Sequence, residues 1–189
     1  VNRYKKYEGF KHSELFSDLH QKVDQVSKAI YVQSKSFDTV LDLAQNKGEM
    51  LAHIPAIQPV ANKNLKRMAS GYGNRIHPVY KTKKMHWGMD FTATTGTEIY
   101  ATGDGVVRAS DNKYSGYGNR VEIDHGYGYV SLYAHMSRMK VRPGQKVKRG
   151  QVIGLVGSTG ASTAPHCHYE VMKDGQKVNP AHYYFNDLT

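Results

Sequence analysis

The strongest constraint on the fold of this chain is the segment from Ser13 to Lys47, which contains neither glycine nor proline. Its apolar residues recur at alternating steps of three and four positions, interrupted only at Gln33. Such heptad spacing predicts a long helix with one apolar seam. The seam comprises Phe16, Leu19, Val23, Val26, Ile30, Phe37, Val40 and Ala44. We therefore expect residues 1–50 to form a helical, coiled-coil stalk that ends at Gly48 and carries no chemistry.

This apolar seam needs a partner, and the sequence leaves three candidates open. They are another copy of the chain, a second helix, and the domain that follows. The polar run of Gln33, Ser34 and Ser36 also offers a place where the helix could fold back into a hairpin. We therefore expect self-association or a regulatory partner to engage the helical extension.

The pattern of residues changes after the predicted helix. Residues 51–68 contain Pro55 and Pro59, which favour an extended linker. Residues 69–189 consist of short alternating runs punctuated by glycine, which is typical of a β domain. The segments that we expect to be strands are GDGVVRAS, NRVEID, YVSLYAH, KVKRGQVIGLVG and HCHYEVM. The fold is thus expected to be mainly β, preceded by an α-helical extension.

The chain is strongly basic. It has 26 lysines and arginines against 16 aspartates and glutamates, a formal net charge of +10. This charge favours polyanionic surroundings such as nucleic acid, anionic lipid or bacterial wall polymers. The cations gather in two groups, Lys63, Lys66, Arg67, Arg75, Lys81, Lys83 and Lys84, and then Lys140, Arg142, Lys146, Lys148 and Arg149. No nucleic-acid-binding motif accompanies them, so we expect no nucleic-acid partner.

Three further observations concern the cell compartment. A single cysteine, Cys167, excludes an internal disulfide. No apolar run approaches the roughly 18 residues of a membrane-spanning helix. The chain begins at Val1 without a charged and apolar leader, which suggests a processed or excised chain whose signal or membrane anchor could lie upstream.

Two short motifs contain residues that can bind a metal ion. In PHCHYE, strand alternation places His166 and His168 on one face and Cys167 on the other. In HWGMD, His86 and Asp90 share a face of an extended segment. Two or three imidazoles and one carboxylate suit Zn²⁺, and three protein ligands leave the fourth position for water or substrate. Without partner cysteines, a closed structural zinc site is disfavoured.

The segment YVSLYAH adds a further histidine by the same alternation. One face carries Val130, Leu132 and Ala134, and the other carries Tyr129, Ser131, Tyr133 and His135. We expect the apolar face to pack inward and His135 to lie on the wet face. There it could hold the water on the metal, accept its proton, or stabilise the charge on an attacked carbonyl. On this prediction, Tyr129 and Tyr133 line the groove that holds the substrate.

The sequence resembles a known family over about residues 69–184. The resemblance rests on GYGNRIHPVYKTKKMHWGMDFTATTGTEIYATGDGVV, YAHMS, VKRGQVIGLVGSTGASTAPHCHYEV and VNP. These segments look very much like the M23 peptidases, the LytM or lysostaphin-type zinc endopeptidases that cut peptide cross-links in bacterial cell walls. The resemblance implies an antiparallel β domain with an open groove that holds the metal.

The resemblance also implies roles for individual residues. It makes His86, Asp90 and His168 the ligands of one zinc ion per chain, and it makes His135 and His166 the catalytic pair. Cys167 stands where the family usually has a bulky aliphatic residue, and we expect it to be a small buried hydrophobe. Tyr169 replaces a common phenylalanine. Arg75 and His77, just upstream of the first ligand, are candidate substrate-binding residues together with Tyr129 and Tyr133.

The function implied by this resemblance is a zinc-dependent endopeptidase of the bacterial cell envelope. A zinc-bound water would attack the scissile carbonyl of a peptide cross-link in peptidoglycan. Whether the bond joins D-Ala to a diamino acid or lies in a glycine-containing bridge stays open. The alternative is a non-enzymatic wall-binding or hydrolase-activating module that uses the same groove.

Overall fold

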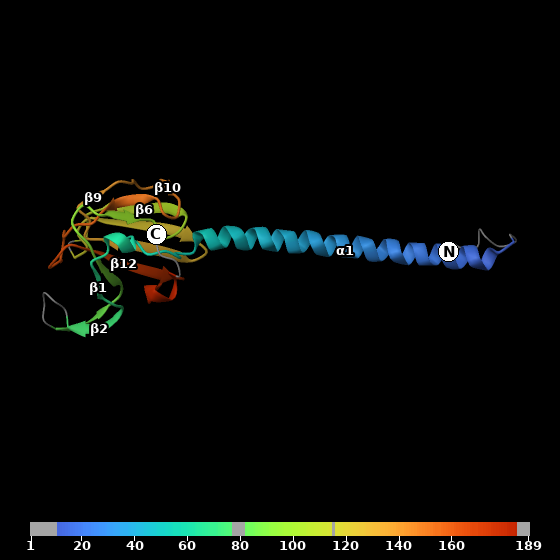
Figure 1. Ribbon diagram of the computed structural model, residues 1–189, viewed down its shortest axis with the longest axis horizontal. Helices are drawn as coiled ribbons and strands as arrows, with labels where there is room; N and C mark the ends of the chain where they lie inside the picture. The colour runs from blue at the N-terminus through green and yellow to red at the C-terminus, as the bar shows by residue number, and fades with distance from the viewer. Residues whose placement is uncertain (1–10, 77–81, 115, 185–189) are drawn as a thin grey trace. The chain divides into compact units, whose positions relative to one another are not determined.

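A computed structural model describes residues 11–76, 82–114 and 116–184. The chain divides into two compact units, residues 1–48 and residues 49–189. The long helix and the β strands are drawn in Figure 1. In the described ranges, no helix combines the length and the apolar character needed to cross a membrane.

Helix α1 (Ser13–His53) is one continuous helix, as the heptad spacing predicts, without a hairpin at Gln33 (Figure 1). None of its residues is buried, and the seam side chains Phe16 and Ile30 are 51% and 64% exposed. The self-association or partner binding expected of this seam therefore stays a prediction.

The expected end of the helix at Gly48 was wrong, because α1 continues to His53. A glycine inside a helix costs only about 1 kcal/mol, which neighbouring interactions can offset. Here the carbonyls of the last turn accept hydrogen bonds from the β unit. The backbone N–H of Asp104 donates to the oxygen of Ala52 at 2.9 Å, and Arg149 Nη1 donates to that of Leu51 at 3.3 Å.

The segment interpreted as a linker, 51–68, packs into the β unit. Val60 is fully buried in the core, and Ala56 donates a backbone hydrogen bond to Thr102. The short 3₁₀ helix η2 (Asn62–Asn64) then leads into β1 (Arg67–Ser70). Residues 51–53 belong to α1 and residues 62–64 to η2, and the stretch with the two prolines between them lacks a helix. The apolar residues of this segment hold it against the domain.

Among the described residues, the main sheet is antiparallel and has eight strands. Seven follow the order β1-β4-β12-β8-β7-β6-β10, and β13 also pairs with β12. Their bounds are β4 (Met89–Thr92), β6 (Gly105–Asp111), β7 (Arg120–Gly126), β8 (Tyr129–Ala134), β10 (Lys146–Val147), β12 (His166–Lys173) and β13 (Gln176–Val178). The central position of β12 places the H-x-H motif in the middle of the sheet.

Two smaller sheets complete the β unit. One joins β5 (Glu98–Tyr100), β11 (Val152–Leu155) and β9 (Arg138–Met139), and the other is the hairpin of β2 (Gly73–Ile76) and β3 (Lys83–His86). A short 3₁₀ helix, η3 (Pro180–His182), follows β13. The expected antiparallel β domain after a long helix is confirmed.

The core lies against the face of the main sheet opposite the metal-binding motifs. It includes Phe91 of β4 and Tyr169 of β12, whose rings pack edge to face at 6.2 Å. Cys167 is also fully buried there, which confirms that it acts as a small hydrophobe pointing away from the two histidines. Strand β8 lies between β12 and β7, and its consecutive residues 131–134, which alternate between the two faces, are all buried. The expected wet face of YVSLYAH was therefore wrong.

Candidate active site

The β-sheet register brings two candidate ligands together. In the antiparallel pair of β12 and β4, His168 lies opposite Asp90, and His166 lies opposite Thr92. Directly opposed residues project from the same face of a sheet, with Cβ atoms about 5 Å apart. The third candidate, His86, ends β3, and the chain turns back into β4 through Gly88.

Gly88 is required by the close approach of this turn to β12. A Cβ atom at this position would lie 2.5 Å from the backbone oxygen of Tyr169 and 2.8 Å from Cε1 of His168. Real Cβ atoms do not approach backbone so closely. The glycine therefore allows the His86 turn to lie directly against the His168 imidazole.

The three candidate ligands form a tight cluster. Oδ1 of Asp90 lies 2.9 Å from Nδ1 of His168 and 3.2 Å from Nε2 of His86, and these two nitrogens are 3.1 Å apart. Tetrahedral zinc with bonds near 2.0–2.1 Å separates its ligand atoms by about 3.3 Å. The donor set and spacing of His86, Asp90 and His168 therefore fit one zinc ion.

The other polar atom of each ligand is held from outside the cluster. Nδ1 of His86 donates to the backbone oxygen of Gly71 at 2.7 Å, and Nε2 of His168 lies 3.0 Å from Oε1 of Glu170. Arg75 Nη2 donates to Oδ2 of Asp90 at 3.0 Å. Such outer partners fix the tautomer and orientation of metal ligands. They leave Nε2 of His86 and Nδ1 of His168 with lone pairs for a metal.

The charges of the cluster follow from these contacts. Burial alone would raise the pKa of Asp90, but hydrogen bonds from His168 and His86 hold it well below its ordinary value. Burial opposes the protonated form of His168, yet Asp90 and Glu170 raise its pKa. An ionised carboxylate at the centre of the cluster is the state that binds a cation.

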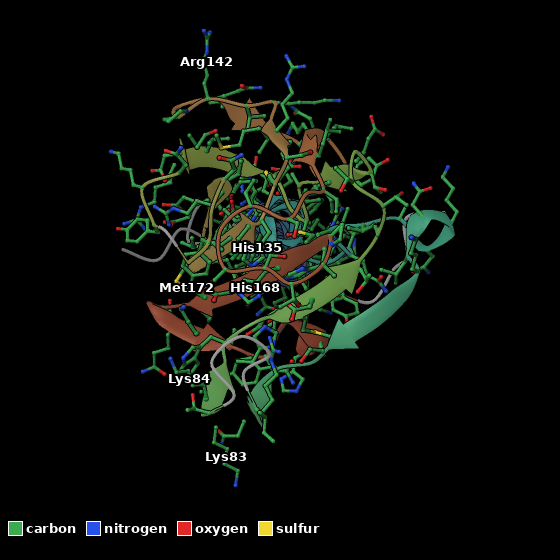
Figure 2. The ribbon with its side chains drawn as sticks, turned by 90° about the vertical axis from the view of Figure 1, so that its left-hand side faces the viewer. Lys83, Lys84, His135, Arg142, His168 and Met172 are labelled. Carbon is green, nitrogen blue, oxygen red and sulfur yellow. The ribbon has the colours of Figure 1, made fainter. Side chains whose placement is uncertain are left out.

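The two other histidines lie beside this cluster. The rings of His135 and His166 are 4.7 Å apart between centroids, and Nε2 of His166 lies 3.6 Å from Oδ1 of Asp90. Nδ1 of His135 donates to the oxygen of Thr159 at 2.7 Å, and Nδ1 of His166 donates to that of Ala164, also at 2.7 Å. These bonds leave each Nε2 as an acceptor. Figure 2 shows His135 and His168 together in the middle of the unit.

The side of β8 on which His135 lies is not set by simple alternation. The strand ends at Ala134, and His135 has a φ of 61°, in the left-handed region that non-glycine residues seldom adopt. Its backbone N–H donates to Tyr117 rather than to a neighbouring strand. Burial, followed by the charge of His166, lowers the pKa of His135 to about 4, so its imidazole is neutral at pH 7.

Of the four expected substrate-binding residues, only Arg75 is found among the described residues that line the groove. Arg75 lines the groove, but its guanidinium contacts Asp90. Tyr133 is fully buried, and its hydroxyl contacts Thr102 and Ser131, so it does not line the groove. Tyr129 packs against Tyr183 and Lys173, away from the cluster. His77 lies outside the described residues.

Glu170 lies at the site but was not among the site residues expected from the sequence. It follows His166 and His168 at the same two-residue spacing on one face of β12. Its side chain is buried, it accepts a hydrogen bond from the Tyr117 hydroxyl at 2.9 Å, and it pairs with Lys177 Nζ at 2.8 Å. The alternation that paired the two histidines extends to Glu170, so the signal was present.

A groove of about 520 Å³ contains the cluster. The β2–β3 hairpin contributes Arg75 and Lys84 to one wall, and Trp87, which is 45% exposed, follows it. The loop of residues 161–165 and Tyr117 also line the groove. The groove is therefore a polar cleft with the five histidine and aspartate side chains at its floor.

A β domain with two imidazoles and one carboxylate around a metal-sized space, and two further imidazoles beside it, has the arrangement of a mononuclear metallopeptidase. The family model described as peptidase family M23 matches residues 84–180. The chain belongs to this family, which confirms the resemblance seen in the sequence.

Individual relatives support this assignment. The chain is 47% identical over 114 residues to the DD-carboxypeptidase/endopeptidase Mpg of Neisseria meningitidis, covering 60% of this chain and 26% of the relative. It is 46% identical over 114 residues to the peptidoglycan DD-endopeptidase ShyA of Vibrio cholerae, with the same coverage. The chain thus spans about a quarter of the length of these curated relatives.

Solved structures show the same fold. A zinc-containing peptidase from Vibrio cholerae has a TM-score of 0.60 and 37% identity, over 70% of this chain and 40% of that one. The catalytic domain of lysostaphin from Staphylococcus simulans has a TM-score of 0.58 and 31% identity, over 65% of this chain and 92% of that domain.

Proposed function

We propose that this chain is a zinc-dependent endopeptidase that hydrolyses peptide cross-links of peptidoglycan, with the DD-endopeptidase activity that its relatives' names describe. The observation that carries the proposal is the set of fixed tautomers in the groove. His86, His135, His166 and His168 each have one ring nitrogen held by an oxygen acceptor, which leaves the other with a lone pair. Such preorganisation suits hydrolysis more than simple ligand binding.

In this proposal, Nε2 of His86, Oδ1 of Asp90 and Nδ1 of His168 hold one zinc ion. When bound, zinc polarises the scissile carbonyl and lowers the pKa of water towards 7. Arg75 acts on Asp90 rather than on the substrate, because its guanidinium is committed to Oδ2 of that carboxylate. All three ligands are intact, which favours an enzyme over the alternative of a non-enzymatic activator.

His135 and His166 are proposed to handle the proton of the attacking water. Nδ1 of each ring donates to a backbone carbonyl, which leaves Nε2 as the acceptor, and His135 is neutral at pH 7. Once protonated, the same nitrogen can donate to the oxyanion that forms on the carbonyl or to the leaving amine. Their 4.7 Å ring separation lets both reach one reacting centre.

The substrate is proposed to be a peptide cross-link, and the site of action the bacterial cell envelope. The groove has a volume of about 520 Å³ and is lined by residues of the β2–β3 hairpin and by residues 161–165, which gives room for a peptide segment. Lys84 on its wall favours substrates that carry carboxylates. The names of Mpg and ShyA place endopeptidase activity in close relatives of this domain.

The test combines elemental analysis with hydrolysis of purified peptidoglycan in the presence and absence of a chelator. We expect about one zinc per chain and chelator-sensitive release of soluble fragments. His86→Ala should abolish both, whereas His182→Ala, an exposed histidine on η3, should change neither. Full activity of His86→Ala in stimulating another wall hydrolase, without release by the wild type, would instead establish the activator.

A further inference from the structure

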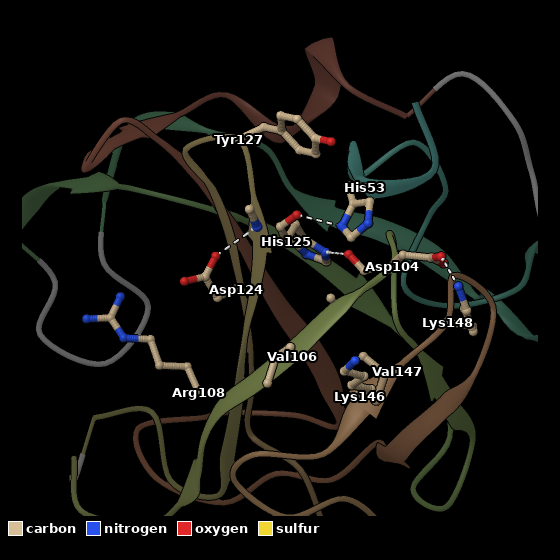
Figure 3. Close-up of a pocket in the computed structure, with 12 residues that line it drawn as sticks. His53, Asp104, Val106, Arg108, Asp124, His125, Tyr127, Lys146, Val147 and Lys148 are labelled. Atoms are coloured by element: carbon tan, nitrogen blue, oxygen red, sulfur yellow. Dashed lines mark hydrogen bonds and ion pairs between the residues drawn. The ribbon is translucent and has the colours of Figure 1, made fainter. Parts of the chain in front are cut away.

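A second hollow lies on the β unit, outside the catalytic groove. It is a cleft of about 650 Å³ over strands β6, β7 and β10, and it shares no lining residue with the groove (Figure 3). We call it the basic hollow, and its side chains of interest are His53, Val106, Arg108, Tyr127, Lys146 and Lys148. Pockets that bind small ligands commonly have volumes of about 300–1,000 Å³.

The three cations of the basic hollow differ in how far they are neutralised. Lys148 pairs with Asp104 at 2.7 Å. Arg108 has a side chain 63% exposed and only a 3.4 Å contact with Glu122, a carboxylate that also binds Arg120. The exposed ammonium of Lys146 has no ion pair or hydrogen bond to any described residue. A second carboxylate, the exposed Asp124, also lines the hollow. The three cations outnumber Asp104 and Asp124, so the hollow keeps an excess of one positive charge.

The basic surface extends beyond the hollow along the chain. Residues 138–149 contain six lysines and arginines and no acidic residue. Within the described ranges, the side chains of Arg138 and Arg142 have no ion pair, and Lys140 has only a 3.8 Å contact with Glu98. Figure 2 shows Arg142 on the opposite side of the unit from Lys83 and Lys84, so this surface is separate from the hairpin beside the groove.

Apolar and aromatic side chains also line the basic hollow, and they favour a ligand that has apolar parts as well as negative charge. Val106, which lies opposite Lys146 in the β10–β6 pair, is 39% exposed on the floor, and Figure 3 shows it between Arg108 and Lys146. Tyr127 is 49% exposed and packs edge-on against His53 at 5.7 Å. A bare inorganic anion would leave these groups uncovered, whereas a short peptide with carboxylates would cover them and meet the cations.

We infer that the basic hollow is a docking site for the carboxylate-bearing peptides of peptidoglycan, distinct from the groove that cleaves them. This inference rests on the proposed function for the identity of the polymer. Weak binding at a second site keeps a polymer substrate near the groove and raises the effective concentration of its cross-links. A soluble fragment with a single cross-link gains nothing from such a site.

The test compares Arg108→Gln/Lys146→Gln with the matched control Lys63→Gln/Lys66→Gln, two exposed lysines outside both pockets. Binding is measured by co-sedimentation with insoluble peptidoglycan under chelation. Cleavage is measured on that polymer and on a soluble fragment that carries one cross-link. We expect the hollow variant to lose about tenfold in polymer binding and cleavage at low salt, with soluble cleavage unchanged. The control variant should match the wild type throughout.

A second arm tests the carboxylate chemistry. Amidation of the peptidoglycan carboxyl groups should reduce binding of the wild type to the level of the hollow variant. Equal binding by the hollow and control variants, or wild-type binding that survives amidation, would overturn the inference. Loss of binding by the hollow variant only towards DNA or anionic vesicles would overturn it too. Absence of soluble cleavage by the wild type would count against the proposed function, while the binding comparison would still stand.

Discussion

Oε1 of Glu170 lies 3.0 Å from Nε2 of His168, on the side of the imidazole away from Asp90. The carboxylate is itself held by Tyr117 and Lys177, which come from a loop and from β13. Burial opposes its charge, but the hydrogen bond from His168 and the pairing with Lys177 keep the pKa of Glu170 below its ordinary value. The charged carboxylate of Glu170 therefore accepts a hydrogen bond from His168 and keeps the proton of this imidazole on Nε2.

Glu170→Gln should weaken zinc binding because the neutral amide is a poorer acceptor for His168. Loss of an outer partner of a metal ligand typically costs about 10–100-fold in affinity. The measurement is the zinc dissociation constant by competition with a chromogenic chelator, with circular dichroism to confirm folding. Glu98→Gln, at a half-buried carboxylate away from the cluster, is the control. Equal zinc affinity in the two variants would contradict the anchoring role.

His166→Ala and His135→Ala should each remove catalysis while the metal stays bound. Neither side chain is needed to complete the cluster of His86, Asp90 and His168. General acid–base groups typically contribute about 10²–10⁴ in rate. Hydrolysis rates and zinc content are measured on the same preparations, with His182→Ala as the control. If either variant kept full activity, that histidine would have no part in proton transfer.

Gly88→Ala should destabilise the β unit, because the added methyl group would meet the backbone oxygen of Tyr169 at 2.5 Å. Overpacking of this kind costs about 1–3 kcal/mol in the free energy of unfolding. Urea unfolding of the metal-free protein gives that free energy without a contribution from zinc. Gly71→Ala is the matched control, since a Cβ atom there has no neighbour within 4 Å and φ is not positive. Equal stability of both variants would show that the turn adjusts freely.

The sequence predicted the clustering of His86, Asp90 and His168 better than it predicted the surroundings of this cluster. Strand alternation is enough to place His166 and His168 on one face, because β12 is regular and paired on both sides. It failed for Tyr133, whose polar hydroxyl is satisfied inside the core by Thr102 and Ser131. No local pattern distinguishes a buried tyrosine with internal partners from one that lines a groove.

Long-range contacts account for the remaining differences. The helix passes Gly48 because Asp104 and Arg149, far along the chain, bind the carbonyls of its last turn. His135 leaves the strand pattern because its φ is positive, and this conformation is held by partners in other loops. Spacing within a short segment carries no information about such partners, so these features had to come from the structure.

His125 should make the stability of the β unit depend on pH in a defined window. Burial lowers the pKa of this histidine to about 4, and its ring contacts the backbone oxygen of Asp104 and the hydroxyl of Ser131. An unfolded histidine has a pKa near 6.5. Between these values the unfolded chain binds the proton and the folded one does not. The stabilisation from neutral His125 is therefore complete above pH 6.5 and is lost as the pH falls towards 4.

The size of this effect follows from the shift, which corresponds to roughly 3 kcal/mol between the two pH limits. Urea unfolding at several pH values, compared with His125→Gln, isolates the contribution of this side chain from those of the carboxylates. The variant should show a shallower decline between pH 6.5 and 4. Imidazole proton resonances in the folded wild type should place the midpoint of His125 titration near pH 4. A midpoint near 6.5, with equal slopes in both proteins, would mean that the buried ring accepts its proton without cost to the fold.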